Sequence, residues 1–277
     1  MASTISVIQP YTRCRSGDVS PFIIILPSKD HVEELASILD GFEVKTRVEG
    51  REPFFTITGK YKVIDLTIAS TGIGAPSLAL ALEEYVRLGG RVFIRVGFGT
   101  GLQSRLSLGD VVLVSSAIRA DGTSRHYAPI EYPAVASYEL IWYAKELFKT
   151  YTRIYDHEMR YHVGLAVSLD VLVGLEDVMR TWAKADALIA DMETSTLYTL
   201  SSIKRLKSLS ILVVDSSIPH GIMPGDLERS IERAGYTKKI NDRLLVASKL
   251  AAEVLVRIRE EYRYQKEVEE RVREQHS

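Results

Sequence analysis

The chain has 277 residues, 46% of them hydrophobic, so it can bury a sizeable core, and one large α/β domain is expected rather than two. Its 35 Lys and Arg residues balance 36 Asp and Glu residues, which argues against binding nucleic acid or an anionic membrane. The single cysteine, Cys14, excludes an internal disulfide, leaves a Cys/His metal site without its usual ligands and favours a reducing, cytoplasmic location.

The first 20 residues are polar and contain Pro10 and Gly17, which predicts an irregular arm. They lack the basic and then apolar pattern of a secretory signal. The longest apolar runs, FIIIL (22–26) and ILVV (211–214), are far shorter than the roughly 20 residues that span a bilayer. We therefore expect buried strands at these runs, in a soluble protein.

After the first strand, apolar spacing predicts a helix over 28–40, with Ser28 as its N-cap. Two β-branched runs within 54–68 predict a hairpin that turns around Gly59 and Lys60.

The next stretch predicts a parallel crossover. A strand (63–70) leads through the glycine turn TGIGAP (71–76) into a helix that ends near Leu88, and a second strand (91–97) follows. FGTG (98–101) predicts a second glycine turn. Two such turns at the carboxyl ends of strands would form a rim where a small polar ligand can lie.

The remaining predicted elements are strand 109–118, loop 125–135, helix 138–149, strand 163–170, helix 176–185, strand 187–192, helix 193–206, strand 210–217 and a long helix over about 240–275. The second half of the last helix is almost all charged. It is either a solvated helix end with i,i+4 pairs or a partner-binding coiled segment.

Arg95 lies in a strand predicted to be buried on both faces. A buried guanidinium needs either a protein carboxylate or a bound anion, and its fork matches phosphate oxygens. Gly97, Gly99 and Gly101 imitate part of a dinucleotide-binding fingerprint, but no helix is predicted after them, so that interpretation is rejected. His126 is either ligand-facing or an ordinary loop histidine.

Two further groups of residues each allow two interpretations. Gly72 and Gly74 precede a helix whose N-terminus could hold an anion or a ribose hydroxyl, or they form a turn without a ligand. Asp191 and Glu193 are either helix-terminal residues, with Asp191 as the cap and Glu193 favouring the helix dipole, or ligand-binding residues. In the second case one carboxylate holds a vicinal diol and Met192 packs beneath a sugar ring.

Three long motifs then give a resemblance: STGIGAPSLALALEEYVRLGGRVFIRVG (70–97), QSRLSLGDVVLVSSAIRADGTSRHYAPIEYPAVASYE (103–139) and DMETSTLYTL (191–200). In this order they resemble the nucleoside phosphorylase family, in its uridine phosphorylase-like branch. The resemblance covers most of 20–217. It implies a single-domain, three-layer α/β/α fold over 1–277 with a mixed, barrel-like central sheet, and a homo-oligomer of dimers that commonly form hexamers.

The implied activity is that of a pentosyltransferase, which cleaves the N-glycosidic bond of a nucleoside with phosphate and releases the base and a pentose 1-phosphate. Nucleoside and phosphate are its expected small-molecule partners, and no metal or organic cofactor is required. The resemblance assigns Arg95 and Glu193 to catalysis. By ligand, the assignments are phosphate for Arg95, Gly72, Ser28 and a neighbour's Arg51 (or Arg47), ribose for Asp191, Met192 and Glu193, and base for Gly99, Leu172 and Asp215 (or Ser216).

Several positions depart from the family pattern. Ser28 and His31 take the places of a glycine and an arginine in the phosphate loop, and Phe98 replaces a hydroxyl residue. Leu172 stands where an aromatic residue would stack on the base, and the insertion that reads uracil is missing. An N-terminal histidine is also absent near Gln9. Phosphate-independent hydrolysis and a non-catalytic paralogue therefore stand beside phosphorolysis.

Overall fold

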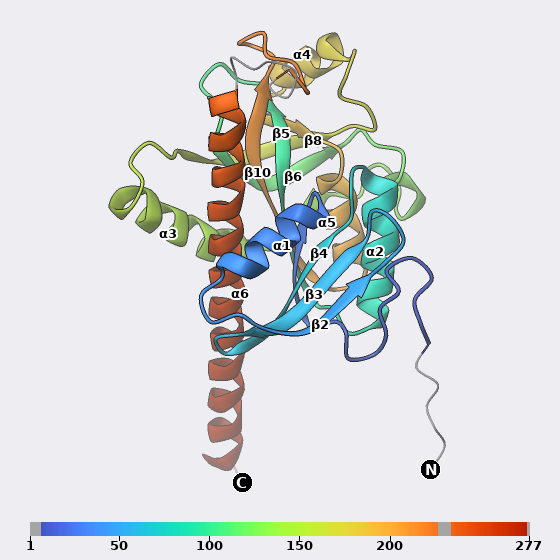
Figure 1. Ribbon diagram of the computed structural model, residues 1–277, viewed down its shortest axis with the longest axis vertical. Coiled ribbons are helices and arrows are strands. Elements are labelled where there is room, and N and C mark those ends of the chain that lie inside the picture. Colours follow the sequence, from blue (N-terminus) through green and yellow to red (C-terminus); the bar gives the residue numbers. More distant parts are fainter. Residues whose placement is uncertain (1–6, 227–233, 276–277) are drawn as a thin grey trace.

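The computed structural model describes residues 7–226 and 234–275 (Figure 1). Its strands are β1 (Phe22–Leu26), β2 (Glu43–Glu49), β3 (Phe55–Tyr61), β4 (Ile64–Ser70), β5 (Val92–Gly101), β6 (Val111–Arg119), β7 (Ala134–Val135), β8 (Tyr161–Ser168), β9 (Ile189–Asp191) and β10 (Lys207–Ser217). Its helices are α1 (Lys29–Ile38), α2 (Ala75–Arg87), α3 (Tyr138–Ile154), α4 (Glu176–Lys184), α5 (Thr194–Ile203) and α6 (Ala234–Gln275), with a 3₁₀ turn at Ser124–His126.

The strands form one mixed sheet in the order β10-β6-β8-β9-β5-β1-β4-β3-β2, with β7 attached to β6. Because β10 also pairs with β5, the strands β5, β10, β6, β8 and β9 close into a barrel-like ring. The predicted mixed, barrel-like sheet is confirmed.

Helices cover both faces of this sheet. Helices α1, α3 and α6 pack on one face, and α2 and α5 pack on the other. Strand β1 lies between them, so Ile24 points into one core while Ile23 and Ile25 point into the other. Helix α4 covers a smaller cluster beside β8 and β9, at the top of Figure 1. The three-layer prediction is confirmed.

The predicted crossover is present. Strands β4 and β5 both run parallel to β1, which lies between them, with Ile24 opposite Ile68 on one side and Ile94 on the other. Helix α2 connects them: Gly74 is its N-cap at φ 100°, Pro76 stands in its first turn and Gly89, at φ 108°, follows its end.

The predicted glycine turn at 98–101 is wrong, because β5 continues to Gly101. Its second half pairs with β10 and with β9. A Cβ on Gly97 would lie 2.9–3.0 Å from the Arg95 guanidinium, and one on Gly99 would lie 2.8 Å from the carbonyl oxygen of Ala190. The glycines are therefore required by close neighbours within a strand, which local sequence cannot distinguish from a turn.

The hairpin is confirmed, but its predicted turn position is wrong. Strands β3 and β4 pair as far as Tyr61 and Ile64, so the turn is Lys62–Val63, with Lys62 at φ 48°. Gly59 lies inside β3, where a Cβ would come within 2.8 Å of the Phe42 ring. The unpredicted edge strand β2 explains this glycine, because it brings its own chain against β3.

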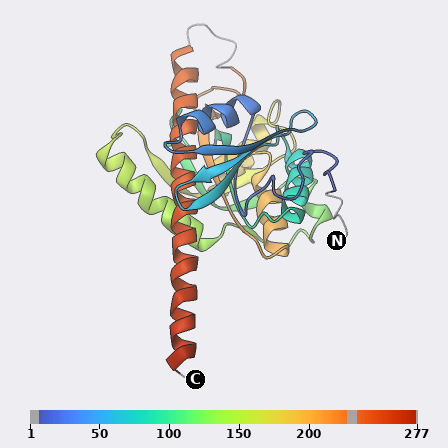
Figure 2. The ribbon, with the colours of Figure 1, turned by 60° about the horizontal axis from the view of Figure 1, so that its bottom comes forward.

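The last helix begins at Ala234, earlier than the predicted residue 240. Leu244, Leu255 and Ile258 are buried against the core. Tyr262 still packs against this core. The carboxyl-terminal part of the helix extends past the body of the molecule (Figure 2), and an Arg263–Glu267 i,i+4 ion pair of 3.7 Å lies beyond Tyr262. This agrees with a solvated end; a partner-binding role stays a prediction.

The arm is irregular from residue 7 to residue 20, as predicted, and its predicted part at 1–6 lies outside the described residues. The buried carboxylate of Glu84 in α2 holds it by accepting hydrogen bonds from the backbone N–H groups of Tyr11 (3.0 Å) and Thr12 (2.7 Å). Across the described ranges, no helix has the length and hydropathy to cross a membrane.

Candidate active site

Arg95 lies at the centre of a buried charge cluster. Its side chain is 9% exposed and forms ion pairs with Asp191, at 3.3 Å from Nη1 to Oδ2, and with Glu193. Asp191 ends β9 and Glu193 directly precedes α5. Of the two alternatives for Arg95, the structure shows pairing with protein carboxylates. One positive and two negative charges share this space.

Glu193 is also held by backbone N–H groups. Its Oε1 accepts a hydrogen bond of 2.6 Å from Gly74, and its Oε2 accepts one of 3.3 Å from Met192. Burial raises the pKa of Glu193; Arg95 and the two N–H groups oppose this rise, while the Asp191 charge adds to it. The first glycine turn thus meets the acid–Met–Glu motif although 119 residues separate Gly74 from Glu193.

Asp191 uses both carboxylate oxygens within the protein. Oδ1 accepts a hydrogen bond of 2.6 Å from the Ser168 hydroxyl. Oδ2 accepts from Thr194, at 2.9 Å from its backbone N–H and also from its hydroxyl. Asp191 thus binds the first N–H of α5, as the capping interpretation predicted, but the N-cap position is Glu193 and not Asp191. A direct contact between Asp191 and ribose stays a prediction.

A cavity of about 480 Å³ opens beside this cluster. Its walls include Gly74, Met192, His126 and Asp170, with Ile73 exposed at its edge. Met192 and Gly74 connect the cavity to Glu193. His126 therefore faces a cavity, which favours the ligand-facing one of its two interpretations.

Three of the residues that depart from the family pattern, Ser28, His31 and Phe98, line a second cavity of about 340 Å³. There His31 Nδ1 lies 2.8 Å from the Ser28 hydroxyl, and the His31 ring meets the Phe98 ring edge to face at 5.8 Å. Burial lowers the pKa of His31, against the opposing effects of Asn241 and two acidic neighbours. Ser28 is also the N-cap of α1, as predicted.

This second cavity is acidic. The carboxylates of Asp30, Glu34 and Asp215 all line it, beside a histidine whose neutral form is favoured. Phe98 packs toward α1, whereas Arg95 points toward the start of α5, on the other face of β5. Ser28 and His31 therefore lie with Phe98, on the face of β5 away from the Arg95 side chain, in acidic surroundings that disfavour an anion.

Other predicted residues lie apart from the cluster. Arg51 is exposed on the loop before β3, and the competing Arg47 pairs with Glu33 at 3.4 Å on the surface. Gly72, at φ 68°, is required by its turn, since a Cβ would overlap the Pro53 ring. Leu172 is half-buried against the cluster under α4.

The sequence indicated an anion or a ribose hydroxyl at the turn before α2, but not that the N–H of Gly74 there binds Glu193. It gave no role to the hydroxyl of Ser168, which binds Asp191. Nor did it indicate Asn241 and Thr237 of α6 as walls of the second cavity. The run Ser168-Leu169-Asp170 was the only local signal, because a hydroxyl group at the end of a buried strand needs a polar partner. Within 7–226 and 234–275, no cluster of three or more His, Cys, Asp or Glu side chains suits a metal ion.

Comparison with known proteins identifies the family of this chain. The model of the phosphorylase superfamily matches residues 21–258. A uridine phosphorylase from Thermococcus kodakarensis is 32% identical, over 75% of this chain and 76% of its own. A guanosine phosphorylase from Halorubrum lacusprofundi is 33% identical, over 78% and 87%. A crystal structure of uridine phosphorylase from Vibrio fischeri superposes with a TM-score of 0.80 at 28% identity, over 92% of this chain and 99% of that one.

Proposed function

Because this chain belongs to the phosphorylase superfamily, we propose that it cleaves the N-glycosidic bond of a nucleoside with phosphate, releasing the free base and a pentose 1-phosphate. The observation that carries this proposal is the buried cluster of Arg95 and Glu193, fixed to the Gly74 turn beside a cavity. The two relatives described above are named phosphorylases, which favours phosphorolysis over hydrolysis and over a non-catalytic role.

In the proposed reaction, Glu193 accepts hydrogen bonds from the ribose hydroxyls and Met192 packs against the sugar. Arg95 holds phosphate beside the anomeric carbon. As the bond to the base breaks, its electron pair leaves with the base, which takes up a proton, and a phosphate oxygen bonds to the anomeric carbon. The anion stabilises the oxocarbenium-like charge, and the fixed ribose keeps the geometry. Phosphate is a co-substrate, and the chemistry needs no metal or organic cofactor.

The proposal is tested by base release. Purified protein is incubated with uridine, guanosine, inosine, adenosine or methylthioadenosine, with and without phosphate, and free base is measured by chromatography. Release that depends on phosphate supports the proposal. Release at the same rate without phosphate would show a hydrolase instead, and no release from any nucleoside would show a non-catalytic member.

Glu193→Gln tests the ribose assignment. The amide loses the charge that pairs with Arg95 and presents an NH₂ group to the existing donors. Calorimetry with the preferred nucleoside should detect no binding to this variant. Glu158→Gln, at a side chain that is 83% exposed, is the matched control and should bind like the wild type. Unchanged affinity in Glu193→Gln would contradict the assignment.

We also propose a homo-oligomer of dimers, with a hexamer as the larger assembly, in the cytoplasm. Arg51 is exposed and has no ion-pair partner among the described residues, as expected of a side chain lent to a neighbour. Light scattering measures the assembly. The Arg51→Met and Glu193→Gln variants can be mixed, dissociated and reassembled into hybrid oligomers. If Arg51 acts on the neighbouring subunit's site, these hybrids should regain part of the activity that each variant lacks alone.

A further inference from the structure

Asp121 is a buried carboxylate that the proposed reaction does not use. It lies just after β6, is 1% exposed, and accepts hydrogen bonds from the backbone N–H (2.6 Å) and hydroxyl (2.9 Å) of Ser124. It also accepts from the hydroxyls of Ser195 and Thr196, the latter at 3.1 Å. These four donors are neutral, and two of them belong to the first turn of α5.

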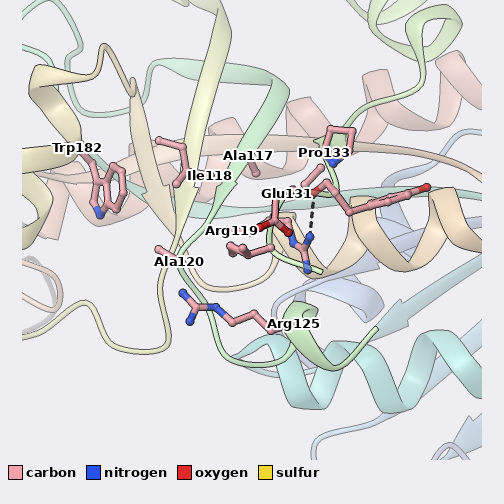
Figure 3. Close-up of a pocket in the computed structure, with 11 residues that line it drawn as sticks. Ala117, Ile118, Arg119, Ala120, Arg125, Glu131, Pro133 and Trp182 are labelled. Atoms are coloured by element: carbon pink, nitrogen blue, oxygen red, sulfur yellow. Dashed lines mark hydrogen bonds between the residues drawn. The ribbon is translucent and has the colours of Figure 1, made fainter. Parts of the chain in front are cut away.

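The loop that follows Asp121 is held by hydrogen bonds from Arg119. Arg119 donates to the Ser124 hydroxyl at 3.0 Å and to the Ser124 carbonyl at 2.7 Å. Its remaining N–H groups donate to the carbonyls of Ala128, Pro129 and Tyr132. Figure 3 shows Arg119 between Glu131 and Pro133 on one side and Arg125 on the other, all three of which belong to this loop. The segment from 120 to 133 is thereby tied to the end of β6.

The first turn of α5 is also linked to Arg95 through a chain of hydrogen bonds. The backbone N–H of Ser195 donates to the Ser168 hydroxyl at 2.9 Å, and that hydroxyl donates to Asp191. Asp191 in turn pairs with Arg95. Glu193 directly precedes this turn, so a shift of the turn moves its carboxylate relative to Arg95 and Gly74.

We propose that Asp121 is a positioning residue, which fixes the first turn of α5 so that Glu193 stays opposite Arg95 and Gly74. It also couples that turn to Gly122, Thr123 and His126, which line the cavity beside Met192. This inference rests on the proposed function of the same site. Its physical basis is that four donors converge on one acceptor-only group, and that a misplacement of about 1 Å costs about 10²-fold in rate.

The test is Asp121→Asn, whose amide turns two N–H donors toward groups that are themselves donors. We expect kcat/KM for the nucleoside to fall about 10- to 100-fold, with a higher KM for the nucleoside and a KM for phosphate within about twofold of wild type. Ser195→Ala removes one hydrogen bond and should show the same pattern more weakly; it serves if the first variant does not fold. Asp110→Asn, which removes another buried carboxylate, is the control and should leave both KM values unchanged.

Amide hydrogen exchange gives a readout that is independent of catalysis. Asp121→Asn should speed exchange in both 122–126 and 193–197, whereas Asp110→Asn should change neither segment. Slower or unchanged exchange at 193–197 in Asp121→Asn overturns the proposal. A wild-type protein that cleaves no nucleoside would refute only the proposed function, and the exchange measurement would still decide the role of Asp121. A lower melting temperature with unchanged kinetic constants also overturns the proposal, because Asp121 would then be structural only.

Discussion

Replacing Arg95 with methionine removes the cation that two buried carboxylates share. Burial already raises the pKa of Glu193, and Arg95 opposes this rise. Without Arg95, the pKa of Glu193 should rise further. A carboxyl group whose pKa is higher in the folded than in the unfolded protein stabilises the fold below the unfolded value. That contribution is lost as the pH rises through the folded value.

The expected loss follows from the partners that remain. Removing one partner of a buried ion pair costs about 3–5 kcal/mol. Asp191 keeps Ser168 and Thr194 as donors, and Glu193 keeps two backbone N–H groups, so the lower end, about 3 kcal/mol near pH 8, is expected. Near pH 5 the loss should be smaller, because a protonated Glu193 no longer repels Asp191.

Urea denaturation near pH 5 and near pH 8, at one fixed protein concentration, measures this difference. With a slope of about 3 kcal/mol/M, the midpoint near pH 8 should fall by about 1 M. Arg105→Met is the matched control, because Arg105 is 54% exposed and pairs with Asp186 at 3.1 Å on the surface. It should cost at most about 1 kcal/mol at either pH. An equal loss for Arg95→Met at both pH values would refute the reasoning.

Three further outcomes are expected. Gly99→Ala places a Cβ 2.8 Å from the Ala190 carbonyl oxygen and should cost about 1–3 kcal/mol, seen as a lower melting temperature; an unchanged one would contradict the packing. Burial alone would raise the pKa of Asp110, but hydrogen bonds, the largest from His162, lower it. Asp110→Asn should therefore lose the most folding stability at neutral pH, and its difference from the wild type should shrink as the pH falls below the ordinary carboxyl range. A stability difference that persists in acid would be inconsistent with this. Burial raises the pKa of the Cys14 thiol, so thiol reagents should label it slowly in the native protein and quickly in denaturant, and rapid native labelling would show that the arm opens.

Much of the fold could be predicted from the sequence, because the residue patterns that indicate strands and helix ends are local. The run FIIIL could only be a strand buried on both faces, and the structure buries all five residues. Pro76 and Gly89 mark the ends of α2 through backbone properties that do not depend on the rest of the chain. The family motifs predicted the barrel-like sheet, which hydrophobic periodicity alone does not distinguish from an open one.

The site was harder to predict, because its contacts join distant residues. Arg95 and Glu193 are 98 residues apart, and only the folded sheet shows that the guanidinium meets carboxylates. The glycines of β5 favour a turn by their local propensity, but the crowding that requires them comes from β9 and from Arg95 itself. Similarly, His31 and Phe98 were each recognised as departures, but their mutual contact needed the structure.

The two faces of β5 differ in how much change of side chain they can accommodate. On the face of Arg95, the glycine positions 97 and 99 have no room for a side chain. On the opposite face, Phe98 is half-buried and borders a cavity, so other side chains fit there. A substitution at residue 98 would therefore change the acidic cavity without crowding Arg95, whereas a side chain added at 97 or 99 would press on the Arg95 guanidinium or on β9.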